Sequence, residues 1–518
     1  FPINGIHSPY AIQDKAVIDS DSVFSSYSKS LDELPDFRKV GDKELTEQLL
    51  EDYIMTMFKR AQVDHAYREP TDDEKTEYER ALESGDQDAI DRFWNKLRIP
   101  KEDTYIAYNG ANFDFYWFYN WIQSKHPKLM DNKASCWKGS TIIRFSFRPP
   151  VSLSNLDEPS SHSIIHFFDL YRHLAPSSLD KAAENYGCVV RKGKFKHELI
   201  KTAEDVSTHK HGEEGWKDYL NLDVEVLREL FSNFHGSVWN LFRVSVLRHP
   251  TAPSLAIRIH KQMMPVDEVY VPDIKADHYF RRAIYGGNTQ IGRMKFEGDP
   301  NDPMDRLVYL DVNSLYPAAM KESIFPVGES VLVEDPDACE SLRVNLNEAW
   351  SVLGWDRQAS FTSPPMFIEC DVEIPKDLLT NPLPRKYVSV TDISCYEDVE
   401  YMRKKAQYGL GWGDLDPIQK NVYYVTQLQF AITKGCIITR IHSYRHFPGG
   451  ETAYLFKDFI DKMMELKISS EELKNKAGEV IGAKNEAQRG VAKLGQNSLF
   501  GKFGERLKTN DFYVLTLE

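Results

Sequence analysis

The chain has 518 residues, of which 42% are hydrophobic, so it is long and apolar enough to form several buried cores. No stretch has the length and hydrophobicity of a membrane span, and we expect no membrane partner. The formal net charge of −14 argues against a surface that is basic throughout, so nucleic-acid contacts must use local clusters of Lys and Arg. The six scattered cysteines form no Cys-x-x-Cys pair, which argues against a zinc site and indicates an intracellular, reducing compartment of unspecified identity.

Two segments of the first half each place an acidic residue on a separate predicted element. A short apolar strand at 105–107 leads into residues 108–114, Tyr-Asn-Gly-Ala-Asn-Phe-Asp. Residues 219–223, Tyr-Leu-Asn-Leu-Asp, lie within a longer helical pattern. Asp114 and Asp223 therefore lie on two separate elements that could share a metal ion. Each pattern alone occurs often by chance, so the prediction depends on their order in the chain.

A segment in the middle of the chain combines an apolar run, an acid and a turn. Residues 306–310 predict a buried strand that delivers Asp311 at its end. Residues 313–315 can turn so that backbone N–H groups point at phosphates, and Pro317 then ends the turn and opens a helix. Tyr316 would lie beneath an incoming sugar and exclude a 2′-hydroxyl. Metal-binding carboxylates and phosphate-binding groups are what phosphoryl transfer requires, although a lone Asp here could equally be a turn residue.

The last third of the chain predicts two helices. Apolar residues from 456 to 466 recur at helical spacing, which predicts one buried face. Arg489, Lys493, Asn497 and Gly501 recur every four residues and form a stripe along a second helix. The two cations can meet a triphosphate, and the glycine allows close approach of a base pair. A basic stripe is usually a solvated face, so the functional interpretation depends on its pairing with the acidic segment.

Together these segments resemble family B DNA polymerases. Residues 311–317 resemble motif A and residues 493–501 resemble motif B, in the form seen in the protein-primed branch of phages, adenoviruses, linear plasmids and self-synthesising transposons. Residues 285–287, Tyr-Gly-Gly, resemble the DNA-contacting element between the exonuclease and polymerase halves. The tripeptide alone could be any tight turn, and its position in the chain favours the DNA-contacting role. The resemblance implies nucleotide contacts at Ser314, Leu315, Tyr316, Lys467, Arg489, Lys493 and Asn497; DNA contacts at Tyr285, Gly286, Gly287, Gly501 and Lys502; catalytic roles for Asp311 and Lys493; and metal ligation by Asp311 and Val312.

The acidic segments of the first half resemble the DEDD-type 3′–5′ exonuclease of the same family, in which four carboxylates bind two metal ions. The resemblance makes Asp114 and Asp223 catalytic metal ligands and gives Tyr219 the role of orienting the attacking water. It also implies that Asn109 and Phe113 hold the single-stranded 3′ end by hydrogen bonding and stacking.

Two parts of the exonuclease pattern fit less well. Ser178 and Leu179 are the nearest match to a DNA-contacting stretch, but a capped helix that starts near Pro176 explains them equally well. The first exonuclease motif, Asp-x-Glu, does not occur in residues 1–108. Asp19 and Asp21 are its closest candidates and are more typical of a polar turn. Because the chain begins with Phe, we expect this motif to be encoded upstream.

The resemblance extends over nearly the whole chain and implies a mixed α/β (α+β) fold. An RNase H-like 3′–5′ exonuclease domain would precede a right-hand palm and fingers with a large insertion. The second palm carboxylates, on a Tyr-x-Asp-Thr-Asp turn, are expected beyond residue 518. The expected domains are the exonuclease at 1–235, with an acidic helical insertion at about 40–98; a connector at 236–295; palm with motif A at 296–330; an insertion specific to protein-primed polymerases at 331–440; fingers with motif B at 441–504; and the start of the return to the palm at 505–518.

The implied function is that of a DNA-directed DNA polymerase that adds deoxynucleotides by two-metal phosphoryl transfer and proofreads with its exonuclease. Its cofactors would be two Mg²⁺ ions per active site, with Mn²⁺ as a substitute. Its partners would be primer–template DNA, deoxynucleoside triphosphates and a terminal protein that primes replication of a viral, plasmid or transposon genome, and we expect a monomer. The alternatives are a protein in which only the exonuclease acts and an inactive DNA-binding relic. A relic should have lost some of the polymerase residues Asp311, Tyr316, Lys493 and Asn497, which are all present.

Overall fold

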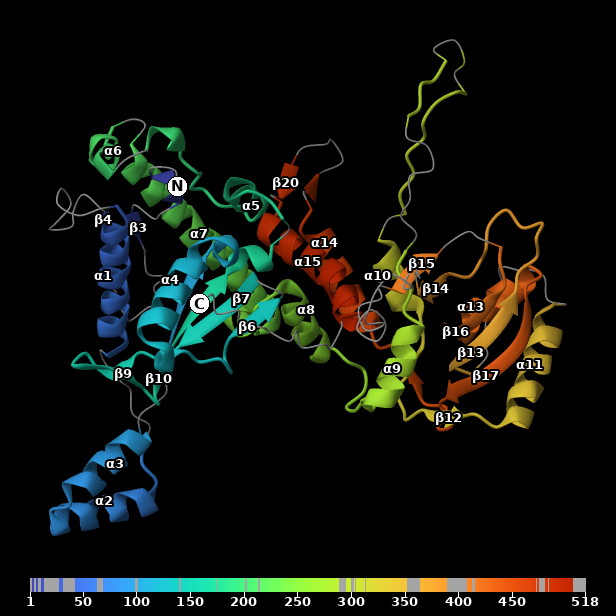
Figure 1. Cartoon of the computed structure of the whole chain (residues 1–518), viewed down its shortest axis with the longest axis horizontal. Coiled ribbons are helices and arrows are strands. Elements are labelled where there is room, and N and C mark those ends of the chain that lie inside the picture. The colour runs from blue at the N-terminus through green and yellow to red at the C-terminus, as the bar shows by residue number, and fades with distance from the viewer. Residues whose placement is uncertain are drawn as a thin grey trace, which may run out of the picture. The chain divides into compact units, whose positions relative to one another are not determined.

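The structure is a computed structural model. Its described residues do not include Asp19, Asp21, Asn313 or residues 511–517, so the predictions made there lie outside them. The chain divides into two compact units, residues 1–262 with 462–518, and residues 263–461. The structure describes residues 2–3, 6–7, 11–13, 28–30, 42–62, 69–97, 101–138, 141–174, 176–200, 203–212, 215–287, 295–299, 302, 304–312, 314–351, 364–388, 408–411, 415–471, 473–474, 480–482 and 484–505 (Figure 1).

A four-stranded mixed sheet forms the centre of the first unit. Its order is β5 (Lys101–Ala107), β10 (Ser163–Asp169), β7 (Thr141–Phe147) and β6 (Cys136–Lys138). β5 and β10 are parallel, whereas the other neighbours are antiparallel. β10 is almost continuously apolar because it lies between β5 and β7 and is covered on its faces. The strand predicted at 105–107 is confirmed as the end of β5.

Helices α1 (Asp42–Gln62) and α4 (Asp114–Lys125) share the core of this sheet. Aromatic rings fill the core, where Phe145 and Phe167 stack at 4.3 Å and Phe115 meets Phe167 edge-on at 5.4 Å. The acidic segment at about 40–98 therefore has two parts. Its first helix, α1, buries one face against the sheet, while α2 (Asp72–Ser84) and α3 (Gln87–Leu97) form a hairpin whose rings Tyr78 and Phe93 stack at 4.3 Å.

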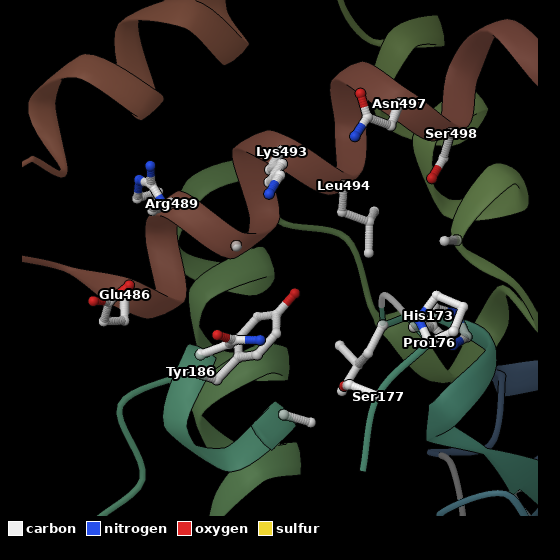
Figure 2. A pocket seen from close by; sticks show the side chains of 15 residues that line it. His173, Pro176, Ser177, Tyr186, Glu486, Arg489, Lys493, Leu494, Asn497 and Ser498 are labelled. Carbon is white, nitrogen blue, oxygen red and sulfur yellow. The ribbon is translucent and has the colours of Figure 1, made fainter. Parts of the chain in front are cut away.

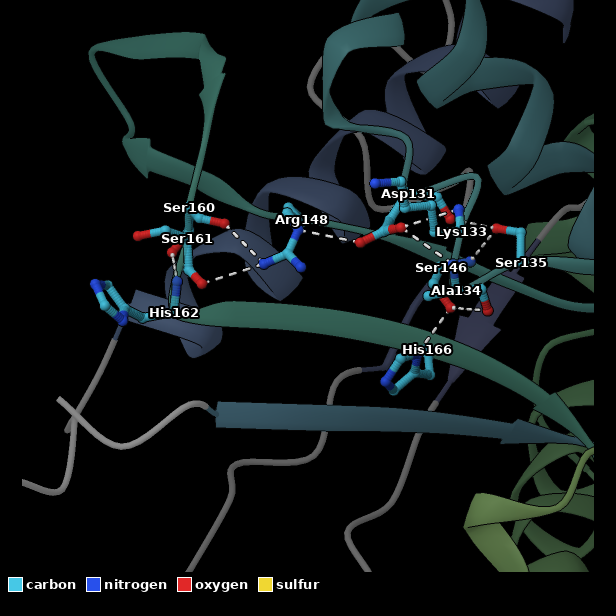
Figure 3. A network of polar contacts seen from close by, with 10 residues as sticks. All are labelled: Asp131, Lys133, Ala134, Ser135, Ser146, Arg148, Ser160, Ser161, His162 and His166. Atoms are coloured by element: carbon cyan, nitrogen blue, oxygen red, sulfur yellow. Dashed lines mark hydrogen bonds and ion pairs between the residues drawn. The ribbon is translucent and has the colours of Figure 1, made fainter. Parts of the chain in front are cut away.

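A polar network closes one side of the sheet (Figure 3). Arg148 pairs with Asp131 at 3.1 Å and also donates to the backbone carbonyl of Ser161 at 3.2 Å. The Ser146 hydroxyl on β7 bonds the His166 ring on β10 at 2.7 Å. Burial lowers the pKa of His166 to about 4, so the ring is neutral at pH 7. The network satisfies polar groups that the sheet would otherwise bury without partners.

Helices from both ends of the sequence complete the first unit. The helix predicted around 219–223 is confirmed as α7 (Trp216–Phe242). The two helices predicted in the last third are confirmed as α14 (Lys457–Ser469), which belongs to this unit from Lys462 onward and has buried residues from Phe456 to Leu466, and α15 (Glu486–Phe503). α15 packs against α7, α8 (Ala252–Lys261) and α5 (Leu179–Asn185), which are far from it in sequence (Figure 1).

The second unit contains a four-stranded antiparallel sheet. Its order is β12 (Val331–Val333), β17 (Ile437–His446), β13 (Met366–Glu373) and β16 (Ile418–Tyr424). Alternate β13 residues, such as Ile368 and Cys370, are buried in a core shared with residues of α11 (Pro336–Ser351) and α13 (Val425–Thr433). Intervening residues meet α9 (Ile274–Arg282), where Arg282 pairs with Glu369 at 2.5 Å. This alternation is the period-2 pattern of a strand between two layers.

Shorter elements complete the described chain. No helix in the described residues is long and apolar enough to span a bilayer. The remaining elements are β1 (Pro2–Ile3), β2 (Ile6–His7), β3 (Ala11–Gln13), β4 (Ser28–Ser30), β8 (Pro150–Ser152), β9 (Asn155–Pro159), α6 (Ala203–Thr208), α10 (Leu315–Glu322), β11 (Phe325–Pro326), β14 (Arg385–Val388), β15 (Tyr408–Gly411), β18 (Thr452–Ala453), β19 (Leu473–Lys474) and β20 (Val480–Gly482).

One predicted element is wrong. Residues 306–310, expected to form a buried strand, are irregular, and Tyr309 and Leu310 remain 90% and 86% exposed. A strand needs a neighbour to satisfy its backbone hydrogen bonds, and none of the described strands pairs with this segment. An apolar run therefore predicts burial correctly only where the fold supplies that neighbour.

Candidate nuclease and nucleotide sites

The carboxylate of Asp169 holds the turn that carries the first acidic segment. Asp169 ends β10, and its Oδ1 and Oδ2 accept hydrogen bonds from the backbone N–H groups of Asn109 at 2.7 Å and Ala111 at 3.2 Å. Asn109 has a φ of 67°, a left-handed conformation that Asn tolerates, and its side-chain oxygen accepts from Asn112 at 2.6 Å. Because β5 and β10 are parallel neighbours, their carboxyl ends bring the turn and Asp169 together.

Asp114 follows this turn as the first residue of α4. Burial, and then the negative charge of Asp169, raise the pKa of the Asp114 carboxyl to about 6. Asp114 is exposed, so solvent reaches its carboxylate. Other protein groups nevertheless surround that carboxylate closely. An accessible carboxylate with a raised pKa is suited to binding a cation, whose charge would favour the ionised form. Asp169 itself is only 1% exposed and fully hydrogen-bonded, which makes it a positioning residue for the turn.

The second acidic segment forms a cluster with Lys192 and His197. Tyr219 and Asp223 lie one turn apart on α7 and therefore share a face of the helix. Lys192 Nζ lies 3.3 Å from Asp223 Oδ2 and 5.0 Å from the centre of the Tyr219 ring. His197 packs edge-on against the same ring at 5.2 Å. Burial raises the pKa of Asp223, although the Lys192 charge opposes that shift.

One atom of this cluster fits a metal ion. Asp223 Oδ1 is buried and has no hydrogen-bond partner in the described part of the chain, so a cation there would satisfy it. No three His, Cys, Asp or Glu side chains in the described ranges lie close enough together to hold a metal ion. The structure therefore does not group Asp114 and Asp223 with a third ligand of this kind, and a shared metal ion remains a prediction.

The predicted DNA contacts of the first unit differ in accessibility. Phe113 is 64% exposed, which leaves its ring available for stacking. Ser178 is the N-cap of α5, and its hydroxyl accepts from the Lys181 backbone N–H at 3.3 Å. The capped-helix interpretation of Ser178 and Leu179 is thus confirmed, and a role in DNA binding is untested.

Motif A lies in the second unit and has few contacts. Asp311 is exposed and has no hydrogen-bond or ion-pair partner in the described ranges, and Val312 is also exposed. Ser314 has a φ of 54° and precedes α10, which begins at Leu315 rather than at the predicted Pro317. Because proline tolerates the first helical turn, the helix can start before it.

The Tyr-Gly-Gly element lies beside motif A. The Tyr316 hydroxyl is 3.8 Å from the position that a Cβ of Gly287 would occupy. Tyr285 donates a hydrogen bond to the Val422 carbonyl at 2.8 Å and stacks on Tyr423 at 5.4 Å, while Gly286 is exposed. Gly287 does not adopt a positive φ, so the tight-turn alternative does not explain why it is glycine.

Motif B lies on α15, where the predicted stripe is confirmed. Arg489, Lys493 and Asn497 line one pocket of 390 Å³ (Figure 2). Arg489 pairs with Glu471 at 2.8 Å, whereas the Lys493 and Asn497 side chains have no partner among the described residues. Lys493 belongs to the first unit and the motif A aspartate to the second, so their action in one site remains a prediction.

The predicted DNA and nucleotide contacts on α14 and α15 that lie outside this pocket are Gly501, Lys502 and Lys467. Gly501 faces open space, so no described neighbour requires a glycine there. Lys502 pairs with Glu505, and Lys467 is half-buried in the last turn of α14. Their predicted contacts with DNA and nucleotide are untested.

The sequence interpretation missed two residues. Asp169 follows an apolar strand, which is the same signal that singled out Asp311, so it could have been found. Lys192 lies in an irregular segment between α5 and α7, and no sequence pattern distinguishes it from neighbouring lysines. Only the tertiary structure places it beside Asp223.

Comparisons with known proteins agree with the motifs. Among curated proteins, the chain is 23% identical over 379 residues to a probable DNA polymerase of Agaricus bitorquis, covering 67% of this chain and 40% of that protein. It is 22% identical over 433 residues to the DNA polymerase of Bacillus phage phi29, covering 80% of this chain and 61% of that protein. The chain therefore spans about two-fifths to three-fifths of the length of these relatives.

A solved structure and a family model complete the comparison. Phi29 DNA polymerase complexed with primer-template DNA and incoming nucleotide substrates is 19% identical, with a TM-score of 0.48 and coverage of 80% of this chain and 61% of that one. A sequence model of the family described as DNA polymerase type B, organellar and viral, matches residues 203–518, which is more than half of the chain. The chain therefore belongs to the organellar and viral type B DNA polymerases.

Proposed function

We propose that the protein is a DNA-directed DNA polymerase that adds deoxynucleotides to a primer by two-metal phosphoryl transfer. The observation that carries this proposal is the α15 stripe, because the family match includes it and its Arg489, Lys493 and Asn497 line one pocket. An unpaired lysine beside a polar amide is the arrangement that binds a triphosphate. These residues would belong to the fingers, and Asp311 would belong to the palm.

The motif A residues would bind the metal ions, the phosphates and the sugar of the incoming nucleotide. When bound, Mg²⁺ ions at Asp311 and the Val312 backbone would neutralise charge on the transferring phosphoryl group. The N-terminal N–H groups of α10, at Ser314 and Leu315, can receive phosphate oxygens. Tyr316 is half exposed and would contact the sugar, where its ring excludes a 2′-hydroxyl.

We also propose that the first unit is a 3′–5′ proofreading exonuclease with an RNase H-like fold. Asp223 offers an unsatisfied carboxylate oxygen, and Tyr219 lies on the same helical face to orient water. Lys192 can hold the scissile phosphate or stabilise the departing oxygen by its charge. Phe113 and Asn109 would hold the 3′ end beside Asp114.

Priming and partners follow from the branch that the motifs resemble. We propose priming by a terminal protein that contacts the segment at 331–440, with primer–template DNA and deoxynucleotides as the other partners and a monomeric polymerase. The five cysteines within the described residues are unpaired, which supports a reducing compartment. An exonuclease-only protein or a DNA-binding relic is the less favoured alternative, because Asp311, Tyr316, Lys493 and Asn497 are all present.

A reciprocal pair of variants tests the proposal. Asp311→Asn should lower primer extension by roughly 10³-fold or more because it removes a carboxylate from phosphoryl transfer, while degradation of single-stranded DNA continues. Asp223→Asn should lower the degradation of single-stranded DNA, while primer extension continues. Both activities would be measured with one labelled primer, with and without deoxynucleotides. Unchanged extension by Asp311→Asn would refute the polymerase assignment.

A further inference from the structure

The loop that carries Lys192 is attached to α7 by a carboxylate. Glu229 is a partly buried residue of α7. Its two carboxylate oxygens accept hydrogen bonds from the backbone N–H groups of Val189 at 2.8 Å and Val190 at 2.9 Å. Hydrogen bonds to an ionised carboxylate are stronger than those between neutral groups, and a pair of them fixes the direction as well as the position of a backbone segment. Glu229 therefore holds this loop against the helix that carries the proposed nuclease residues.

The loop depends on such an acceptor because its own backbone supplies no regular structure. Residues 189–196, all within the described range, form neither a helix nor a strand. Their backbone N–H groups therefore lack the partners that a helix or a sheet would provide. Val189 is 85% exposed, so burial of its side chain does not anchor the loop either. The carboxylate of Glu229 supplies both missing partners.

A second carboxylate holds the next two residues of the loop from a different helix. Asp180 on α5 accepts a hydrogen bond from the backbone N–H of Lys192 at 3.2 Å, and it pairs with the Arg191 side chain at 3.2 Å. The Asp180 side chain is 44% exposed, so we expect it to contribute less than the partly buried Glu229. The backbone of Lys192 is thus held from both α5 and α7.

The loop then passes directly over the part of α7 that contains the nuclease cluster. A Cβ at Gly193 would lie 3.1 Å from Leu222 Cδ1 and 3.5 Å from Tyr219 Cα, so the backbone of the loop runs close to the helix there. Lys192 precedes this glycine, and its Nζ lies 3.3 Å from Asp223 Oδ2. The position of this charge is therefore determined by how the loop is attached.

We propose that Glu229 is a positioning residue of the nuclease, which keeps the ammonium group of Lys192 beside Asp223 and Tyr219 by holding the backbone of the loop. The inference rests on the proposed nuclease function and extends it to a carboxylate that acts through the lysine. One helix would then fix both partners of the ion pair, because α7 contains Asp223 and also binds the loop through Glu229. A lysine has a flexible stem, so its charge is precisely placed only where its backbone is held.

The first test measures the acetylation of Lys192 by an amine-specific reagent, in the full chain and without DNA. The reagent requires a neutral amine, so the pair with Asp223 should protect Lys192. Glu229→Gln should speed its acetylation about 5-fold, because a released loop forms the pair less often. Asp223→Asn removes the partner itself and gives the upper limit of the rate. Glu184→Gln, at an exposed glutamate of α5, is the matched control, and Lys128 is the exposed internal reference for mass spectrometry.

The second test is a double-mutant cycle on the degradation of single-stranded DNA. Glu229→Gln should lower the maximal single-turnover rate about 5- to 30-fold, while the DNA concentration that gives half of this rate changes less than about twofold. In a Lys192→Met background, the same substitution should lower the rate less than about twofold, because the group that it positions is absent. Asp180→Ala should repeat the pattern with a loss of about 2- to 5-fold. It is an exposed site, so it serves if circular dichroism shows Glu229→Gln to be unfolded.

The two tests separate this inference from the proposed function. Faster acetylation of Lys192, together with loss of the Glu229→Gln effect in the Lys192→Met background, would support it. An acetylation rate unchanged by Glu229→Gln would overturn it. Equal losses of nuclease rate in both backgrounds would also overturn it, since Glu229 would then act independently of the lysine. If the unmodified chain degrades no DNA while Glu229→Gln still speeds acetylation, the proposed nuclease is refuted and the placement of Lys192 by Glu229 is supported.

Discussion

The two predicted catalytic regions are held in place in different ways. In the first unit, the turn before Asp114 is fixed by buried hydrogen bonds to Asp169, and Asp223 is paired with Lys192. In the second unit, Asp311 lies on an exposed, irregular segment without a partner in the described ranges. The sequence motif of the second region is the more specific of the two, yet fewer contacts hold its residues in place. The specificity of a sequence motif therefore indicates the chemistry of a site. It does not indicate how many contacts hold the residues of that site in place.

The largest expected effect of this difference is on stability. Asp169→Asn replaces one of two buried acceptor oxygens with a donor that faces backbone N–H groups, and should lower the stability of the first unit by about 2–4 kcal/mol. Asp311→Asn, at an exposed site, should change stability by less than about 0.5 kcal/mol. Thermal midpoints measure both. The control is Asp157→Asn, since Asp157 is an exposed acid of the first unit. Equal thermal midpoints for Asp169→Asn and Asp157→Asn would show that the buried hydrogen bonds to Asp169 do not stabilise the first unit.

Lys192→Met should lower nuclease activity by roughly 100-fold while it retains most of the side-chain volume. The substitution removes the charge that lies 3.3 Å from Asp223 and faces the Tyr219 ring. Single-turnover degradation of single-stranded DNA is the measurement. Lys181→Met changes an exposed lysine of α5 and should retain full activity. A Lys192→Met protein as active as that control would show that the cluster is only structural.

Gly490→Ala should destabilise the first unit by about 1–3 kcal/mol, because the new Cβ would overlap the Tyr186 ring and force α15 away from α5. Gly501→Ala is the matched change on the same helix, where the added Cβ meets open space. It should stabilise the helix by about 0.5–1 kcal/mol. If both substitutions shifted the thermal midpoint in the same direction, α15 would not pack on α5 as described.

The smallest expected effect is that of pH on the proposed nuclease activity. Because the pKa of Asp114 is raised to about 6, the carboxylate is protonated below that pH and binds cations poorly. The rate should therefore fall about tenfold per pH unit below 6. The folded state also holds this proton more tightly than the unfolded state, so stability should fall as pH rises from about 4 to 6. Asp114→Asn should reduce that slope in a series of thermal midpoints and not abolish it, because the pKa values of Asp169 and Asp223 are also raised by burial. A slope unchanged by the substitution would refute the shift at Asp114.

The sequence predicted local elements well where one periodicity dominates. The helices α7, α14 and α15 follow from their apolar patterns because each buries one face, and β5 follows from its short apolar run, which is partly buried. The strand predicted before Asp311 was wrong because a strand forms only where a neighbouring strand pairs with it. The local apolar pattern contains no information about that neighbour. Lys192 was missed for a similar reason, since its role depends on a contact made across the fold. Position along the chain identified the motifs, but tertiary contacts determine which side chains meet.

Two glycines make α15 sensitive to substitution. A Cβ at Gly490 would meet the Tyr186 ring, and one at Gly495 would lie 2.7 Å from Met463 Sδ on α14. The flexible Met463 side chain can move aside, whereas the buried Tyr186 ring cannot do so easily, so this packing requires glycine chiefly at position 490. Relatives with a larger residue at position 490 must place the helix differently, and that position can therefore serve, across the family, as a sequence marker of how each polymerase docks its motif B helix.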